Sequence, residues 1–257
     1  MICRLITIFV LATAWICPVQ AMSSASPLVA TASGMQFAIR EIALKFYEDT
    51  GIKVRITLGS SGNLYRQIKN NAPFDLFISA DNSLTKKLES EKLTLNDSVV
   101  IAKGRLVVFA PNGSPLIPDE HLGGLKIALS EGQITRFAIA SPKHAPYGQR
   151  AKEALQSAQL WEAVKDKLVI GENVSQAAQF VVSGAAQGGI IAQSLVVVDE
   201  ISHRGQYALL PESWHQPILH SMVLLKNADE AALKLFEYIR SIKGQDILSL
   251  HGFNPSY

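Results

Sequence analysis

The chain has 257 residues, of which 48% are hydrophobic, 18% charged and 7% aromatic. This is the composition of a globular protein that is long enough to bury one large core or two smaller ones. The 24 basic and 22 acidic residues leave a net charge of +2, which excludes a strongly basic nucleic-acid binder and an acidic disordered chain. With only two cysteines, Cys3 and Cys17, a disulfide-rich small fold is also excluded.

Residues 1–21 have the order of parts of a secretory signal peptide. Arg4 supplies the positive charge, Leu5 to Cys17 form an apolar run that is short for a membrane span, and Val19-Gln20-Ala21 offers a cleavage site. Cleavage after Ala21 would leave a mature chain without cysteine, in the periplasm. The less favoured alternatives are an uncleaved anchor and a lipid on Cys17, where Ile16 replaces the small residue that a lipidation motif needs.

Short apolar runs alternate with helical patterns along the rest of the chain, which predicts an α/β fold with largely parallel sheets. In chain order we expect a strand at Leu28–Ala32, a helix from Met35 to Thr50, a strand at Val54–Leu58, a short helix from Leu64, a strand at Phe74–Ile78, a helix around Leu84–Leu88, strands at Arg105–Ala110 and Lys126–Leu129, a helix at Gly148–Gln159, a strand at Leu168–Ile170, a helix at Ser175–Ser183, a strand at Gly189–Ala192, and helices at Ala231–Ile242 and Gln245–Leu250.

The length after cleavage, about 235 residues, exceeds one ordinary domain and favours two lobes. Pro111–Pro118, which is rich in Gly and Pro, is one candidate crossing between them, and Pro211–Pro217 is the second. Two crossings would bring the C-terminal segment back to the first lobe. We therefore predict a first lobe of residues 22–108 and 218–257 and a second lobe of residues 109–217.

Enzyme motifs are weak in this sequence. The six histidines form no i, i+4 pair and no H-E-x-x-H motif, and the chain has no phosphate-binding loop and no G-x-G-x-x-G. Gly59-Ser60-Ser61-Gly62 differs from a G-x-S-x-G elbow because the second serine and the second glycine are adjacent. We expect no catalytic residues, no direct metal ligands and no cofactor. A serine hydrolase that uses Ser61 is kept as an alternative.

Four small polar turns each precede a predicted helix, two in each half of the chain: Thr31–Gly34, Gly59–Asn63, Pro146–Gly148 and Gly171–Ser175. Such turns present free amides and the positive end of a helix dipole, and in open α/β sheets they lie at the edge where ligands bind. Any one of them alone is most simply a helix cap. Four turns on facing lobes would hold an anion by amides and hydroxyls instead of by Lys or Arg.

At these turns the sequence resembles the periplasmic molybdate-binding proteins of molybdate ABC transporters, and the likeness covers almost all of the mature chain. It is carried by Ala32-Ser33, Gly59-Ser60-Ser61-Gly62-Asn63-Leu64, Ala72-Pro73-Phe74-Asp75-Leu76-Phe77-Ile78-Ser79-Ala80-Asp81, Pro146-Tyr147-Gly148, Glu172-Asn173-Val174 and Gly252-Phe253. The run from Ala72 to Asp81 is the most specific. The resemblance implies a two-lobe periplasmic binding protein fold of type II. Each lobe is then a mixed, mostly parallel sheet flanked by helices, and two segments cross between the lobes.

The resemblance also implies a set of oxyanion ligands. Ser33 and Ser61 match two residues that donate through hydroxyls. Tyr147 and Val174 match two backbone donors, and Gly34 is a further candidate.

One position departs from the family pattern. The family's ligand-binding tyrosine follows a Gly-Ile-Val-like strand, and the matching residue here is Ala192. A donor is therefore missing. We hypothesise that the phenol of Tyr147 turns into the cleft to replace it, with Gln193 as a second candidate. Glu172 is expected to point away from the ligand.

The implied function is that of an extracytoplasmic solute-binding protein of an ABC importer. Its ligand would be molybdate and tungstate, and its partner a permease in the inner membrane; the protein would be a monomer, with no enzymatic activity and no nucleic-acid partner. Molybdate is a dianion that can only accept hydrogen bonds, which suits a site built from donors. Sulfate, chromate or phosphate binding remains an alternative, and so does a sensor of the same fold that docks on a receptor.

Overall fold

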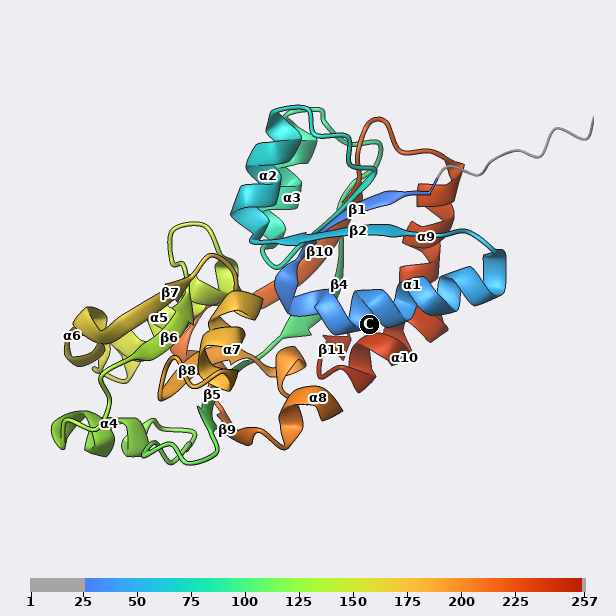
Figure 1. The fold of residues 1–257 in the computed structure, drawn as a ribbon. Coiled ribbons are helices and arrows are strands. Elements are labelled where there is room, and N and C mark those ends of the chain that lie inside the picture. Colours follow the sequence, from blue (N-terminus) through green and yellow to red (C-terminus); the bar gives the residue numbers. More distant parts are fainter. Residues whose placement is uncertain (1–25, 256–257) are drawn as a thin grey trace, which may run out of the picture.

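The computed structural model describes residues 26–255, and its strands form two separate sheets, each at the centre of one lobe (Figure 1). The first lobe holds six strands in the order β11-β4-β10-β3-β1-β2. They are β1 (Leu28–Ala32), β2 (Arg55–Gly59), β3 (Leu76–Ser79), β4 (Val99–Gly104), β10 (Ile218–Leu224) and β11 (Asn254–Pro255). β1 is parallel to β2 and β3, whereas β10 and β11 make antiparallel pairs.

The second lobe has a five-stranded mixed sheet in the order β7-β6-β8-β5-β9. Its strands are β5 (Leu106–Pro111), β6 (Phe137–Ala140), β7 (Leu168–Gly171), β8 (Gly188–Ala192) and β9 (Gly205–Leu209). β6 is parallel to β7 and β8, and β5 is antiparallel to β8 and β9. In both lobes the three parallel strands end at the edge that faces the other lobe, so the turns after them meet.

The first crossing between the lobes is shorter than the sequence suggested. β4 ends at Gly104 in the first sheet and β5 begins at Leu106 in the second, so Arg105 alone lies between them. The predictions of a crossing at Pro111–Pro118 and of a first lobe that reaches residue 108 are wrong, because residues 106–111 pair with β8 and β9. The chain returns to the first lobe through residues 210–217, between β9 and β10.

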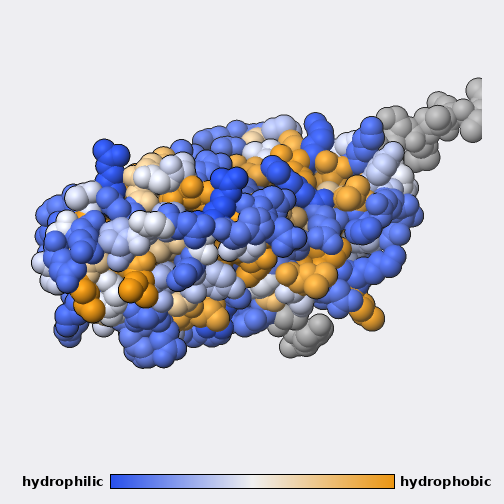
Figure 2. Space-filling view, turned by 60° about the horizontal axis from the view of Figure 1, so that its bottom comes forward, coloured by the Kyte–Doolittle hydropathy of each residue, from blue (hydrophilic) through white to orange (hydrophobic). Residues whose placement is uncertain are grey.

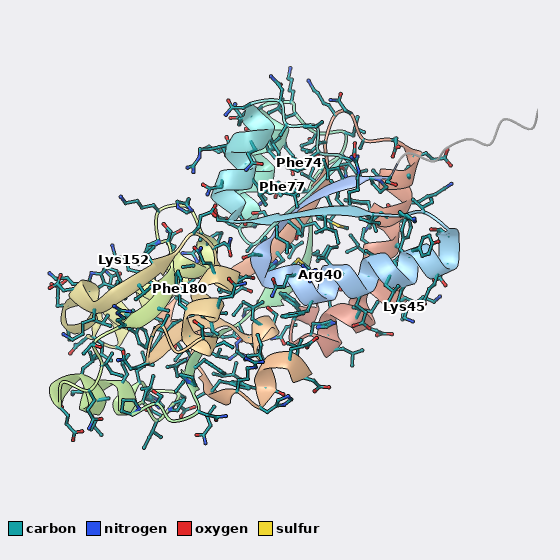
Figure 3. The ribbon with its side chains drawn as sticks, viewed as in Figure 1. Arg40, Lys45, Phe74, Phe77, Lys152 and Phe180 are labelled. Carbon is teal, nitrogen blue, oxygen red and sulfur yellow. The ribbon has the colours of Figure 1, made fainter. Side chains whose placement is uncertain are left out.

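Helices cover both faces of the first sheet. The helical segments are η1 (Ser33–Met35), α1 (Gln36–Thr50), α2 (Ser61–Lys69), α3 (Asn82–Ser90), α9 (Glu230–Arg240) and α10 (Ile242–Leu250). α1, α9 and α10 share one hydrophobic core, in which Ile39, Ile42 and Phe236 are buried. α2 and α3 pack on the other face, over Phe74 and Phe77 (Figure 3).

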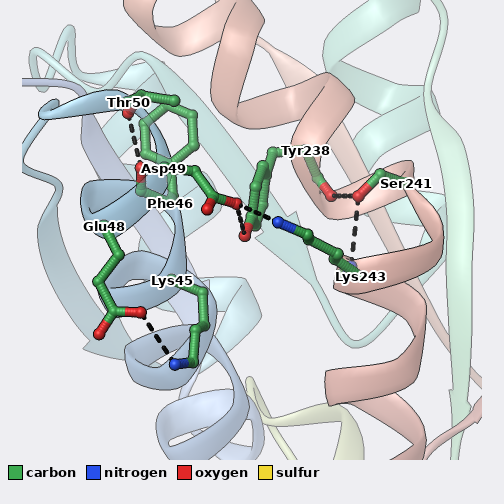
Figure 4. A network of polar contacts seen from close by, with 9 residues as sticks. Lys45, Phe46, Glu48, Asp49, Thr50, Tyr238, Ser241 and Lys243 are labelled. Carbon is green, nitrogen blue, oxygen red and sulfur yellow. Dashed lines mark hydrogen bonds and ion pairs between the residues drawn. The ribbon is translucent and has the colours of Figure 1, made fainter.

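The end of α1 is joined to the two C-terminal helices by a small polar network (Figure 4). The carboxylate of Asp49 accepts hydrogen bonds from the Tyr238 hydroxyl at 2.9 Å and from the Lys243 ammonium at 2.7 Å. Both contacts lower the pKa of Asp49. α1 ends at Gly51, whose φ of +73° is one that glycine adopts without strain. The network therefore connects the first helix with the C-terminal helices, which follow the second crossing.

The second lobe carries the helical segments α4 (Gly123–Ser130), α5 (Pro146–Ser157), α6 (Trp161–Val164), η2 (Lys165–Lys167), α7 (Val174–Val182), η3 (Gln193–Leu195), α8 (Asp199–Ser202) and η4 (Glu212–Trp214). The predicted strand at Lys126–Leu129 is wrong, because these residues belong to α4. Asp119 accepts hydrogen bonds from the amides of Gly123 and Gly124, at 3.0 and 2.6 Å, and so starts a helix there.

The surface of the described residues mixes polar and apolar side chains. On the face drawn in Figure 2, hydrophobic residues lie among hydrophilic ones. Within residues 26–255 no helix is both long and apolar enough to cross a membrane. The predicted signal peptide, residues 1–21, lies outside the described residues.

Candidate anion-binding site

All four polar turns meet in one pocket between the lobes. The pocket encloses about 190 Å³, including the part open to solvent. It is lined by Ala32, Ser33, Gly34, Gly59, Ser60, Ser61 and Ala80 from the first lobe and by Ala145, Pro146, Tyr147, Asn173 and Val174 from the second. None of these lining residues is charged. The arrangement is therefore a neutral site made of hydroxyls, small residues and the first turns of helices.

Ser61 is the first residue of α2, directly after the turn that follows β2. Its side chain is fully buried, and its Oγ accepts a hydrogen bond from the amide of Ala80 at 3.0 Å. Ala80 follows β3, the second neighbour of β2 in the sheet. Because a serine hydroxyl has one donor and two acceptor sites, the hydroxyl hydrogen of Ser61 is left for a ligand.

Ser33 opens η1, directly after β1. Its Oγ lies 3.3 Å from the amide nitrogen of Ser175 in the second lobe, from which it accepts a hydrogen bond. The Ser175 hydroxyl in turn donates to the carbonyl of Ser33 at 2.9 Å. Like Ser61, Ser33 thus keeps a hydroxyl hydrogen that can point at a bound acceptor.

The second lobe contributes two helix N-termini. Tyr147 is the second residue of α5, after Pro146, and Val174 is the first residue of α7. First-turn amides have no acceptor within their own helix, and the positive end of the helix dipole lies beside them. The side chain of Asn173 caps α7 by accepting from the Gln176 amide at 3.1 Å. The backbone amides of Tyr147 and Val174 can therefore donate to an anion in the pocket.

Hydrogen bonds across the pocket mouth join the lobes in a closed arrangement. The amide of Gly62 donates to the carbonyl of His144 at 3.0 Å, and Ser60 Oγ lies 3.1 Å from His144 Nδ1. A Cβ atom on Gly62 would lie 2.6 Å from that carbonyl oxygen, so only glycine allows this approach. The Glu172 carboxylate accepts a hydrogen bond from the side-chain nitrogen of Asn63 at 2.6 Å and does not line the pocket, as predicted.

The hypothesis that the phenol of Tyr147 enters the cleft is wrong. Its hydroxyl lies 3.1 Å from His220 Nε2, and a Cβ atom on Gly104 would overlap that hydroxyl. Burial raises the pKa of Tyr147 and lowers the pKa of His220 to about 3, so both side chains are neutral at physiological pH. The phenol thus points to the hinge between the lobes.

Neither Ala192 nor Gln193 takes the place of the missing donor. Ala192 is the last residue of β8, is fully buried and does not line the pocket. The side chain of Gln193 lies at Gly252, where an added Cβ atom would contact it at 3.4 Å. The pocket therefore offers the predicted serines and amides, with Gly34 beside them, and no tyrosine hydroxyl.

The histidine nearest to the pocket does not favour the hydrolase alternative. His144 contacts Ser60 and not Ser61, whose Oγ contacts the Ala80 amide. In the described part of the chain, no group of three or more His, Cys, Asp or Glu side chains could hold a metal ion.

Two lobes with mixed sheets, two crossings and a pocket between them define the periplasmic binding protein fold. The sequence model for bacterial extracellular solute-binding proteins matches residues 27–254, and the chain belongs to this family. Relatives that it resembles are named as binding proteins and not as enzymes, and one of them, from Bacillus subtilis, is named as a putative ABC transporter substrate-binding lipoprotein.

Two relatives of this chain have names that state the same ligand, molybdate. The chain is 34% identical over 236 residues to the molybdate-binding protein ModA of Azotobacter vinelandii, with 91% of each chain covered. It is 34% identical over 229 residues to ModA of Rhodobacter capsulatus, which covers 88% of this chain and 87% of the relative. The solved structure of the Azotobacter vinelandii periplasmic molybdate-binding protein superposes with a TM-score of 0.83 at 26% identity, over 90% of this chain and 100% of that chain.

Sequence reasoning missed several residues that shape the site. Ser175 is predicted as the end of the fourth polar turn and the start of a helix, but its contact with Ser33, which joins the lobes, is not predicted. Ser60 and His144 close the pocket mouth. Ser60 and Ser175 could have been found from the sequence, because each is a polar residue directly beside a predicted ligand. His220 could not, because its partner Tyr147 is 73 residues away in the chain.

Proposed function

We propose that this chain is the extracytoplasmic solute-binding protein of an ABC importer and that it carries molybdate and tungstate. The named ligand of its relatives supports molybdate. The proposal places the mature protein in the periplasm as a monomer, secreted by the N-terminal signal peptide, with a permease in the inner membrane as its partner.

The observation that carries the proposal is the hydrogen-bond state of the two serines. Each Oγ already accepts from a backbone amide, Ser61 from Ala80 and Ser33 from Ser175. Each hydroxyl hydrogen can therefore only donate to something else. Because no lining residue is a carboxylate, the pocket suits an anion that accepts at every oxygen. Fully deprotonated molybdate and tungstate are such anions, whereas a protonated phosphate needs an acceptor.

The proposed ligands are the hydroxyls of Ser33 and Ser61 and the backbone amides of Tyr147 and Val174, with the amide of Gly34 as an additional donor. They come from both lobes, so a bound anion joins the lobes together. The absence of a charged lining residue means that helix N-termini and hydroxyls balance the ligand charge. Hydrogen bonds to a charged partner contribute about 1.5–3 kcal/mol each.

The experiment is calorimetric titration of the secreted, cleaved protein with molybdate, tungstate, sulfate, chromate and phosphate. We expect molybdate and tungstate to bind most tightly, with phosphate weakest near neutral pH. Preferred binding of phosphate would contradict the acceptor-only argument. Preferred binding of sulfate would keep the donor site and overturn the choice of ligand.

A further inference from the structure

The side chain of Tyr147 connects the pocket with the hinge. Tyr147 lines the pocket, and its ring passes beside Gly34, where an added Cβ atom would lie 3.0 Å from Tyr147 Cε2. The hydroxyl at the far end contacts His220 and lies against Gly104. Tyr147 is 3% exposed, so the whole side chain is enclosed between the lobes.

The hydroxyl lies where the chain passes between the lobes. Gly104 is the last residue of β4, directly before Arg105 makes the first crossing. His220 is the third residue of β10, which the chain enters after the second crossing. β4 and β10 are paired neighbours in the first sheet. A side chain from the second lobe is thus inserted against both hinge strands of the first.

The same phenol belongs to a row of polar groups that returns to the pocket. Ser194, from η3 of the second lobe, lies near the Tyr147 hydroxyl and lowers its pKa. The Ser194 hydroxyl donates to the carbonyl of Gly34 in the first lobe at 2.7 Å. Two hydrogen bonds, Tyr147–His220 and Ser194–Gly34, therefore cross the lobe boundary near each other, and the second ends one residue after Ser33.

The buried imidazole of His220 depends on the Tyr147 hydroxyl for its hydrogen bond. Its side chain is fully buried, and its ring packs edge-to-face on Phe253 with 5.0 Å between the ring centres. Its Nδ1 is buried without a hydrogen-bond partner in the described chain. Tyr147 is then the polar contact of the imidazole at Nε2. If the lobes separate and withdraw the phenol, a buried imidazole loses this partner, which is unfavourable.

We propose that the Tyr147 hydroxyl is a hinge latch that stabilises the closed form and so sets how long the anion is retained. This inference rests on the proposed function, because retention presupposes an anion between the lobes. Tyr147 is then a ligand through its backbone amide and a positioning residue through its phenol. The latch acts between neutral groups and at a distance from the anion.

The first arm of the test is Tyr147→Phe, which keeps the ring and the amide. We expect molybdate to dissociate about 3- to 10-fold faster, as loss of one net hydrogen bond implies, with an almost unchanged association rate. Tyr207→Phe is the matched control, because Tyr207 is exposed on β9 of the same lobe. Equal dissociation rates for Tyr147→Phe and the parent would overturn the latch.

The second arm measures the lobe separation with and without molybdate. Since Cys3 and Cys17 are the chain's cysteines and both precede the proposed cleavage site, spin labels can be attached at Gln67→Cys on α2 and Gln156→Cys on α5. Tyr147→Phe should shift the distance distribution towards longer separations. An affinity loss with no such shift would mean that the phenol contacts the anion, which overturns the proposal. If the parent binds no anion, the proposed function fails, and the anion-free distances still test the latch.

The third arm adds a methyl group at Gly104 and then removes the Tyr147 oxygen that the methyl group would overlap. Gly104→Ala places a methyl group onto the Tyr147 hydroxyl and should open the lobes and speed dissociation more than Tyr147→Phe does. The double variant Gly104→Ala/Tyr147→Phe removes the overlapping oxygen and should regain part of the loss. A double variant that is no better than Gly104→Ala would contradict the inserted hydroxyl. Should Gly104→Ala fail to fold, the first two arms decide.

Discussion

Ser33 and Ser175 are joined twice across the boundary between the lobes. The Ser175 amide donates to Ser33 Oγ, and the Ser175 hydroxyl donates to the Ser33 carbonyl. Both residues are buried. Because Ser33 is also a proposed ligand, this pair connects lobe closure directly to the orientation of a donor in the pocket.

Replacing Ser175 by alanine should therefore weaken binding without removing any proposed ligand. The substitution deletes the donor to the Ser33 carbonyl and keeps the backbone amide. We expect a loss of about 1 kcal/mol in molybdate binding free energy, the net value of one hydrogen bond, measured by calorimetry. Ser183→Ala, at the exposed end of the same helix, is the control and should bind like the parent. An unaltered affinity for Ser175→Ala would show that the pair does not contribute to closure.

Ser61→Ala should lower both affinity and stability. The lost hydroxyl donor to a charged ligand is worth about 1.5–3 kcal/mol of binding free energy. The lost Oγ also leaves the buried amide of Ala80 without its acceptor, so the free energy of unfolding should fall by about 1–3 kcal/mol. Calorimetry and urea unfolding measure the two effects, and Ser90→Ala on the exposed end of α3 is the control. A variant that binds as well as the parent would remove Ser61 from the site.

Molybdate affinity should vary little between pH 6 and 8. The lining contains no carboxylate, lysine, arginine or histidine, and burial keeps Tyr147 and His220 neutral across this range. Titrations at several pH values test this expectation. A steep dependence of the affinity on pH would contradict a neutral donor site.

Folding stability, in contrast, should decrease on acidification because of His220. Its pKa is about 3 in the folded protein, below the ordinary value of 6.5, so the unfolded state binds more protons between these values. Stability is then fully present above pH 6.5 and is lost as the pH falls. From pH 7 to pH 5 this one group removes about 2 kcal/mol from the free energy of unfolding.

Urea unfolding at the two pH values, with His220→Gln as the non-titrating comparison, measures this contribution. The parent should lose about 2 kcal/mol more than the variant over the interval. Equal losses in the two proteins would mean that His220 is not held neutral by burial.

The sequence predicted the polar turns well because the signals are local. Gly59-Ser60-Ser61 ends one strand and begins one helix, and small residues there are visible without any tertiary information. The same holds for Asn173, a side-chain cap at the start of α7. Parallel strands then place the turns at one edge of each sheet, which follows from the alternation of strands and helices.

Features that depend on distant partners were missed. β10 is a buried strand with little alternation, and it pairs with β3 and β4, which precede it by more than 100 residues. The crossing at Arg105 has only Gly104 beside it and no loop rich in Gly or Pro, because one residue is enough to pass from one sheet to the other. The phenol of Tyr147 was misplaced because the space beside Gly104 exists only after both crossings are formed.

The most direct test of a neutral donor site is a crystal structure of the cleaved protein grown with molybdate, with data collected at the molybdenum absorption edge. The account predicts one strong anomalous peak between the lobes. The anion oxygens should lie within about 3 Å of the Ser33 and Ser61 hydroxyls and of the Tyr147 and Val174 amides. A peak held by lysine or arginine side chains, or one outside this pocket, would contradict it.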